Sequence, residues 1–246
     1  MKKAVFTIVK DESQYLPIWM RHYSKYFKQE DIFVLDDSSA DKMPFKLLED
    51  YDHSVIEVFN QFSFDVHWLA SVVADMQRSL LTTRGYDMVL FAEADEIIVP
   101  NKKFENHLKD NDIVRCTGYE VIHQKGEKVI DWDKKLLKQR KGWFRNPRFD
   151  KPLLSKVACA WTPGFHTCRQ NPNAPIDDSL ILIHLRRIDY GYTYDRLAKR
   201  RKWKRPPGQA VTMAHQWGLE MEDFDRWFYD TKAQIVDIPA EYKNVC

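Results

Sequence analysis

The sequence predicts an α/β fold in which helices flank a central, mostly parallel β-sheet. Short apolar runs with β-branched residues alternate with longer segments whose apolar residues recur at helical spacing. Acidic clusters directly follow three of these runs, which is typical of strands that end at the ligand-binding edge of such a sheet. The alternation itself favours parallel strands joined by right-handed crossovers.

The first half of the chain supplies most of this pattern. Helices are expected at residues 14–26 and 68–84, and a weaker helix or loop at 45–51; Asp11 or Ser13 could cap the first helix. Gly85 ends the long second helix. Short buried strands are expected at residues 4–9, 31–35, 54–59, 88–92 and 97–99.

The second half is more mixed. The segment 123–149 is polar, basic and aromatic, and we expect it to be a long functional loop that covers a site. A helix is expected from about Tyr194 and a last one at 221–230. Further strands are expected at residues 113–122, 153–160 and 180–184.

Composition limits the classes of function. The chain has 246 residues, a hydrophobic content of 44% and a charged content of 30%, which is ordinary for one large globular domain or a domain with an added subdomain. The net charge of +2 provides no overall field for nucleic acid, so we expect no nucleic-acid partner. No apolar run approaches the roughly 20 residues that span a bilayer, and the N-terminal run is too short for a signal peptide.

The cysteines point to a reducing compartment. The four residues show no CxxC spacing, which favours free thiols over a disulfide framework or a zinc site, although Cys159 and Cys168 could bridge. We therefore expect a cytoplasmic protein.

The stretch from Asp87 to Pro100 contains the most informative cluster of acidic residues in the chain. Glu93, Asp95 and Glu96 lie between two apolar runs, where burial of acids is costly unless a partner compensates them. Mg²⁺ or Mn²⁺ would do so, because hard cations prefer carboxylate oxygens. A solvated polar loop end is the alternative, and this stretch alone leaves both open.

Two more acidic clusters change that balance. Asp11 and Glu12 follow the first strand, and Asp36 and Asp37 follow the second. Carboxyl ends of parallel strands share one sheet edge, so we expect these acids to lie near Glu93 and Asp95. Their joint placement favours a metal or nucleotide site over the solvated alternative.

At this point the motifs resemble a known family. TIVKDE at 7–12, VLDDSSAD at 34–41 and LFAEADE at 90–96 resemble the nucleotide-sugar domain of glycosyltransferase family 2-like enzymes. GYEVI at 118–122 and IHLRRID at 183–189 are similar to a bacterial and viral branch of that group. The resemblance covers residues 4–195. It implies one GT-A domain, with a nucleotide-sugar half at 1–100, an acceptor-side half at 101–195 and a helical extension at 196–246.

The resemblance also implies roles for individual residues. EAD at 93–95 takes the place of the DxD motif, with Asp95 as the first choice of metal ligand and Glu93 beside it. His166 or His184 resembles a late histidine that completes the metal shell or meets the diphosphate. Donor contacts are implied for Val9, Glu12, Asp36, Asp37, Arg78, Glu93 and Ala94.

The resemblance implies transfer of a sugar from a nucleotide-diphosphate sugar to a saccharide or other hydroxyl acceptor, with inversion. A divalent ion, Mn²⁺ or Mg²⁺, would neutralise the leaving diphosphate, and a carboxylate would take the acceptor proton. Glu120 is our choice for this base, alongside Asp95 in the catalytic set. The other candidates are Glu96, Asp177 and Asp178.

Other features leave alternatives open. The basic run at 199–205 could contact an anionic membrane surface, although a solvated helix end explains it better. Trp132, Trp143 and Trp161 could form a sugar-stacking platform or belong to the core. The rival functions are a non-catalytic nucleotide- or glycan-binding module and a metal-dependent phosphohydrolase or nucleotidyltransferase.

Overall fold

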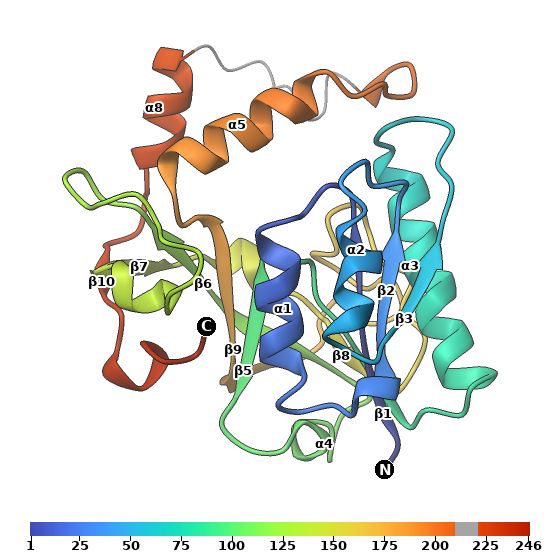
Figure 1. Ribbon diagram of the computed structural model, residues 1–246. Helices are drawn as coiled ribbons and strands as arrows, with labels where there is room; N and C mark the ends of the chain where they lie inside the picture. The colour runs from blue at the N-terminus through green and yellow to red at the C-terminus, as the bar shows by residue number, and fades with distance from the viewer. Residues whose placement is uncertain (210–220) are drawn as a thin grey trace. The chain divides into compact units, whose positions relative to one another are not determined.

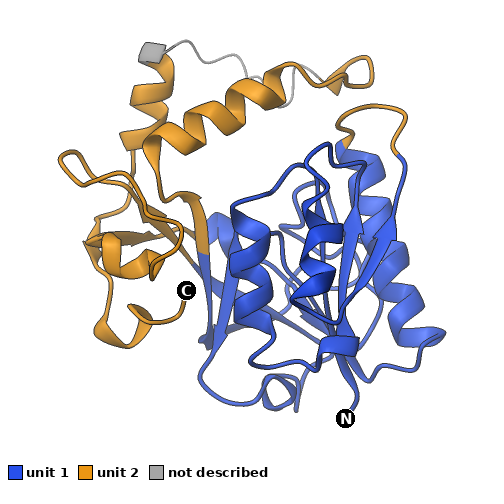
Figure 2. Ribbon diagram, viewed as in Figure 1, with its two compact units in different colours: residues 1–59, 66–118, 147–183 blue, residues 60–65, 119–146, 184–246 orange. Residues whose placement is uncertain are grey.

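The computed structural model describes residues 1–209 and 221–246 (Figure 1). It divides into two compact units (Figure 2). Unit 1 comprises residues 1–59, 66–118 and 147–183, and unit 2 comprises residues 60–65, 119–146 and 184–246. Two strands, β6 (Ile113–Ile122) and β9 (Ile176–Arg187), begin in unit 1 and end in unit 2.

The expected parallel sheet forms the centre of unit 1. Its strands have the order β4-β1-β2-β3, and the pairings β4 with β1, β1 with β2, and β2 with β3 are all parallel. The strands are short and apolar, and Ala4, Val5 and Phe6 of β1 are fully buried. The α/β prediction is therefore confirmed. The strands are β1 (Lys3–Val9), β2 (Ile32–Asp36), β3 (Ser54–Glu57) and β4 (Met88–Phe91).

Helices follow these strands in the predicted order. The expectation that Asp11 or Ser13 caps the first helix is wrong, because Gln14 is the N-cap and no side chain caps the helix. The apolar face of α3 packs inward through Ala70, Val73 and Leu80. The helices of unit 1 are α1 (Tyr15–Tyr23), α2 (Met43–Lys46), α3 (Val66–Thr82) and α4 (Phe104–His107).

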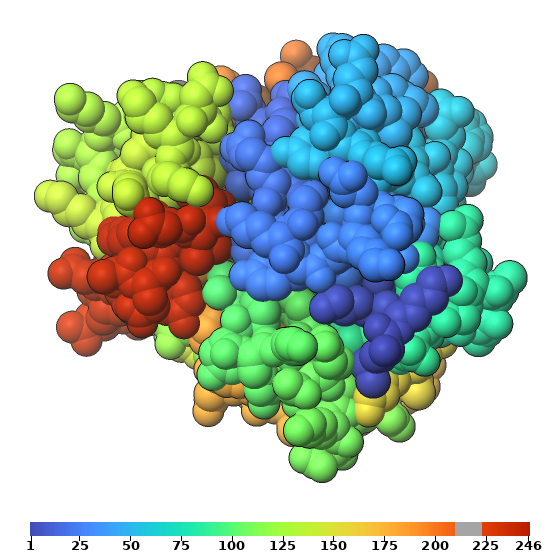
Figure 3. Space-filling model, turned by 60° about the horizontal axis from the view of Figure 1, so that its bottom comes forward, coloured from blue at the N-terminus to red at the C-terminus, as the bar shows by residue number. Residues whose placement is uncertain are grey.

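Further strands extend unit 1, and the pairings of β8 are antiparallel. β8 (Leu154–Ser155) pairs with β4 on one side and with the start of β6 on the other, and β5 (Glu96–Pro100) pairs with β9. The strand expected at 153–160 is thus much shorter, because the Ser155 hydroxyl donates to the carbonyl of Val157 and closes a turn. Figure 3 shows the N-terminal residues at the surface, where Met1 is 67% exposed.

Unit 2 has its own small core. The second half of β6 pairs with β7 (Gly142–Arg145), and β7 pairs with β10 (Val236–Asp237), all antiparallel. The 3₁₀ turn η3 (Leu136–Gln139) and β7 lie within the segment expected to be a long loop, so that expectation is wrong. The core brings together Ile122, Phe144, Leu197, Phe224 and Phe228.

Two helices complete unit 2. α5 (Tyr190–Arg201) begins four residues earlier than expected, because the Asp189 carboxylate accepts a hydrogen bond from the Tyr192 N–H and caps it. α8 (Met221–Tyr229) agrees with the expected last helix. The strand expected at 180–184 is longer, since β9 includes the polar residues at 177–179. None of the helices in the described ranges has the length and apolar character that a bilayer crossing requires.

Candidate nucleotide site

The order of the parallel strands reverses beside β1. The chain passes from β1 outward to β2 and β3, and then returns so that β4 lies on the other side of β1. In open α/β sheets, ligands bind beyond the carboxyl ends of the strands at such a reversal. Glu12, Asp37 and Glu93 follow β1, β2 and β4 at this edge, so the predicted gathering of the acids is confirmed within unit 1.

The loops after β1 and β2 are tied together and strained. Asp11 and Ser38 each have a φ of 55°, in the left-handed region that residues with a side chain rarely adopt. The Asp11 Oδ1 accepts hydrogen bonds from the backbone N–H of Ala40 at 2.6 Å and of Asp41 at 3.3 Å. The Asp11 N–H donates to the Ser39 hydroxyl at 3.0 Å. Backbone strain of this kind persists where the surroundings enforce it, and often at ligand sites.

Asp36 and Asp37 are buried at this edge, with 1% and 7% exposure. The Asp36 Oδ1 accepts from the Ser39 N–H at 3.1 Å. In the part of the chain that the structure describes, Asp36 Oδ2 and Asp37 Oδ1 have no hydrogen-bond partner. Buried carboxylate oxygens without donors are rare, because leaving them unsatisfied costs free energy.

The charge of Asp37 is destabilised by its surroundings. Burial raises the pKa of Asp37 to about 6, and the negative charges of Asp36 and Asp11 add to this rise. Lys10 opposes it, with its Nζ 3.5 Å from Asp37 Oδ2. Val9 contributes its backbone, since its carbonyl accepts from the Asp37 N–H at 2.9 Å. Glu12 is also buried, at 6% exposure.

The acid motif after β4 forms a tight turn. The Glu96 N–H donates to the Glu93 carbonyl at 2.9 Å, and the Glu93 N–H donates to the Glu96 carboxylate at 3.0 Å. Ala94 is 4% exposed and Asp95 is 6% exposed. The turn therefore buries most of the motif, and only the Glu93 side chain is substantially exposed, at 34%.

A lysine that the sequence interpretation did not assign to the site fills this turn. The Lys151 Nζ lies 2.5 Å from Glu93 Oε2 and 2.5 Å from Glu96 Oε1. The Lys151 side chain is only 2% exposed and Glu96 is fully buried. Burial by itself would lower the pKa of Lys151, but the two carboxylates outweigh it and raise that pKa well above its usual range.

Lys151 bears on the expected metal site through Glu93. Glu93 already has a cation as its partner, and a second cation beside Lys151 would be repelled. Among residues 1–209 and 221–246, no three histidine, cysteine, aspartate or glutamate side chains gather so that they could hold a metal ion. Mg²⁺ is commonly held by one or two carboxylates together with substrate phosphates, so Asp95 as the first ligand, with Glu93 and with His166 or His184 completing the shell, stays a prediction.

The two candidate histidines differ in their surroundings. His166 is exposed and follows a turn in which Gly164 and Phe165 both have positive φ, and its Nδ1 lies 2.5 Å from the Arg148 carbonyl. His184 is buried in unit 2, where its Nδ1 lies 3.6 Å from Glu120 Oε1. The expected roles of both histidines stay predictions.

Arg78 lies on the exposed face of α3. Its guanidinium is 2.8 Å from the Asp75 carboxylate one turn earlier, and both side chains are more than half exposed. The buried face of the same helix carries Gln77 and Leu80. An exposed pair of this kind contributes little to stability, and the diphosphate role of Arg78 stays a prediction.

Glu120 lies in a buried ionic cluster of unit 2. Its carboxylate is 2% exposed, 3.5 Å from the Arg187 Nε and 3.0 Å from the Asn146 amide that donates to it. Burial would raise the pKa of Glu120, but His184 and Arg187 outweigh it and lower the pKa to about 2. A carboxylate with so low a pKa has little basicity at neutral pH, although its assignment as the base stays a prediction.

The other candidate bases also have partners. Glu96 is held by Lys151, and Asp177 lies 2.7 Å from His107 Nδ1. Burial would raise the pKa of Asp177, but hydrogen bonds from Ser179 and His107 lower it to about 2. The Thr117 hydroxyl donates to Asp178 at 3.1 Å.

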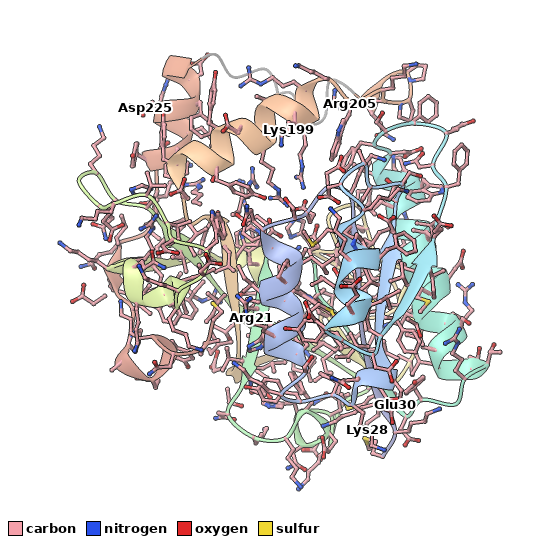
Figure 4. All side chains as sticks on the ribbon, in the orientation of Figure 1. Arg21, Lys28, Glu30, Lys199, Arg205 and Asp225 are labelled. Carbon is pink, nitrogen blue, oxygen red and sulfur yellow. The ribbon has the colours of Figure 1, made fainter. Side chains whose placement is uncertain are left out.

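The aromatic and basic features favour structural roles. Trp143 and Trp161 are each 3% exposed and belong to the core, whereas Trp132 packs edge-on against Tyr192. In the basic run at 199–205, whose end residues Lys199 and Arg205 are labelled in Figure 4, Trp203 stacks on Phe64 with 6.0 Å between ring centroids. The four cysteines are free, as expected.

Comparisons with known proteins give only a distant likeness. No family model matches the chain, and no curated protein matches it in sequence. The solved structure of S. aureus TarS is 13% identical over 92% of this chain, with a TM-score of 0.45, and the match spans 42% of the TarS chain. Glucosyl-3-phosphoglycerate synthase from Mycobacterium tuberculosis, solved with Mn²⁺, uridine diphosphate and phosphoglyceric acid, is 16% identical over 48% of this chain and 43% of its own, with a TM-score of 0.33. At these scores the likenesses assign neither a family nor an activity.

Proposed function

We propose that this chain is a glycosyltransferase of the GT-A type that takes a sugar from a nucleotide-diphosphate sugar and transfers it to a hydroxyl acceptor. One observation carries the proposal. Asp36 and Asp37 are buried at the strand-order reversal, and each has a carboxylate oxygen without a donor among the described residues. Such a pair is suited to a ligand that brings donors of its own.

A nucleoside has the donors that this pair needs. Its ribose hydroxyls and base N–H groups can donate to carboxylate oxygens, and hydrogen bonds to a charged acceptor are stronger than neutral ones. Donors from the ligand would also compensate the charged form of Asp37, whose pKa burial raises. The linked loops after β1 and β2 hold the two acids in place before the ligand arrives.

Glu93 would face the sugar side of the same ligand. Its position is fixed by Lys151, and its side chain keeps 34% exposure, so it can accept a hydrogen bond from a donor hydroxyl. Lys151 supplies a positive charge beside Glu93 in this proposal. Asp95 would be the residue that holds a divalent ion, which would neutralise the leaving diphosphate.

The test is a binding screen by thermal shift and calorimetry. UDP, GDP, CDP and dTDP are each added with EDTA or with Mn²⁺ to the wild type, to Asp36→Asn and to the control Asp50→Asn, which changes an exposed acid. One nucleotide should raise the melting temperature. Asp36→Asn should weaken its binding roughly tenfold or more, as expected for loss of a charged hydrogen-bond acceptor, and the control should not.

A second function, a nucleotide-binding module without turnover, is favoured by one observation. Glu120 has a pKa of about 2 and is held by Arg187, so it is poorly suited to take a proton from an acceptor. An assay of sugar transfer from the matching nucleotide sugar distinguishes the glycosyltransferase from the binding module. Binding without transfer to any of a panel of hydroxyl acceptors would support the module, and absence of nucleotide binding would contradict both functions.

A further inference from the structure

Unit 2 contains a hollow of about 550 Å³ with an uneven charge. Its lining has six cationic side chains and two acidic ones, Glu127 and Asp131. The whole chain is nearly balanced, with 38 basic and 36 acidic residues, so composition does not explain this excess. The cationic residues are Lys128, Lys134, Lys138, Arg140, Lys141 and Lys243.

Both acids of the lining are already engaged. One oxygen of Glu127 accepts from the Lys141 N–H at 2.7 Å, and the other accepts from the Gln124 N–H at 2.8 Å. The Asp131 carboxylate lies 2.6 Å from the Lys134 Nζ and also accepts from the Asp133 N–H. Glu127 also lies 3.8 Å from the Arg140 Nε, so each acid has a cation of the lining as its nearest ionic partner, Arg140 for Glu127 and Lys134 for Asp131.

The walls of the hollow are held in a fixed arrangement. Arg140 is 1% exposed, and its guanidinium donates to the carbonyls of Ile188, Lys128 and Gln139. The Gln139 side chain accepts from the Asp131 N–H and donates to the Asp131 carbonyl, each at 2.8 Å. The Lys243 Nζ donates to the Arg140 carbonyl at 2.6 Å. Arg140 and Lys243 thus position the backbone of the walls.

Three lysines are left to act on a ligand. Lys128, Lys138 and Lys141 are exposed, and within the described chain their ammonium groups have no carboxylate partner. Val129, which is 75% exposed, adds an apolar side chain to the same lining. These groups suit a saccharide that carries anionic substituents. The lysines would bind the anionic groups, and the C–H face of a sugar ring would pack against the apolar side chain of Val129.

We propose that this hollow binds phosphate or carboxylate groups of an anionic saccharide. This binding of anions does not depend on the proposed function. A phosphate-bearing chain and a uronate-bearing chain offer the same chemistry to the lysines, so the experiment treats them separately. Nucleic acid is tested as a competitor.

The experiment measures binding to polyphosphate, polygalacturonate and neutral dextran at low and at moderate salt. The variant Lys128→Gln/Lys138→Gln/Lys141→Gln removes the three lysines. The control Lys28→Gln/Lys46→Gln/Lys109→Gln removes three exposed lysines of unit 1 and lowers the net charge equally. At least one polyanion should bind the wild type and the control alike, and the first variant roughly tenfold or more weakly. Dextran should not bind.

Several results would overturn the proposal. These are equal losses in both triple variants, no binding of either polyanion, or equally tight lysine-dependent binding of a single-stranded oligonucleotide. Preference for polyphosphate or polygalacturonate identifies which anionic group the hollow takes. Nucleotide binding is measured in the same samples: if it is absent while polyanion binding persists, the proposed function falls and the anion site stands.

Discussion

Two pairs of acidic residues at the same sheet edge of unit 1 differ in how their negative charge is compensated. Glu93 and Glu96 share the Lys151 ammonium at 2.5 Å each, and Lys151 is driven toward its charged form. Asp36 and Asp37 retain oxygens without donors among the described residues, and the pKa of Asp37 rises to about 6. A buried cation lies 2.5 Å from both acids of the first pair, whereas the second pair has, in the described part of the chain, only Lys10, 3.5 Å from Asp37, and the pKa of Asp37 shows that this compensation is partial.

The difference indicates which pair is structural and which is for a ligand. A buried charge with a good partner keeps its turn in one conformation, but that partner also excludes a competing cation. A buried charge that its partner compensates only in part lowers stability, and it can persist where ligand binding later satisfies it. The predictions below test this contrast, starting with the change expected to cost most.

Lys151→Met should be the most destabilising change. It leaves the fully buried Glu96 without its cation, and truncation of one member of a buried pair typically costs about 3–5 kcal/mol. Urea denaturation measures the free energy of unfolding. The control Lys109→Met, at an exposed position, should stay within about 0.5 kcal/mol of the wild type.

A double variant separates charge from packing in the same turn. Lys151→Met/Glu96→Gln removes the buried negative charge along with its partner, so it should be more stable than Lys151→Met alone. If Lys151→Met is as stable as the wild type, the lysine does not compensate these acids. The contrast between the two pairs would then be lost.

Glu120→Gln tests a buried acid with a cationic partner in unit 2. It should lower the free energy of unfolding by about 2–4 kcal/mol at pH 7. The folded pKa of about 2 lies below the usual 4.5, so this stability is present above pH 4.5 and is lost as pH falls toward 2. Denaturation at pH 7 and pH 3, with the exposed Glu49→Gln as control, measures the difference. A variant of normal stability that binds nucleotide but transfers no sugar would instead identify Glu120 as the base.

Local pattern was sufficient to predict the parallel sheet, because each strand from β1 to β4 is a short apolar run beside an amphipathic helix. It failed where tertiary pairing decides the structure. β7 has only four residues and is a strand because β6 and β10 pair with it on either side. β8 ends early because a turn follows Ser155.

The site was predictable only in part, for the same reason. Acids that follow strand ends can be found from the sequence, since the topology brings them to one edge. Lys151 could not be assigned to the motif, because it lies 58 residues beyond Glu93 and nothing local marks it as buried. The capping expectation failed for Asp11 because its carboxylate binds the loop at 40–41 instead.

Asp37→Asn should stabilise the ligand-free protein at pH 7.5 by about 1–2 kcal/mol. The folded pKa of about 6 exceeds the usual 3.8, so the folded state favours the protonated acid, and the wild type loses stability as pH rises through this window. The gain should vanish at pH 3.5, where the wild-type carboxyl is also neutral. Melting temperatures at the two pH values measure this, and a destabilised variant at pH 7.5 would contradict the claim that Lys10 compensates Asp37 only in part.

Ser38→Gly tests the strain of the backbone beside Asp36 and Asp37 and should have the smallest effect on stability. Ser38 is exposed at a φ of 55°, where glycine avoids a steric cost but adds freedom to the unfolded chain. A net gain of about 0.5 kcal/mol follows. Ser71→Gly, at an exposed position inside α3, should have the opposite sign and lose about 0.5–1 kcal/mol. If both substitutions destabilise equally, the loop after β2 stores no strain, and its shape is not maintained at a cost for a ligand.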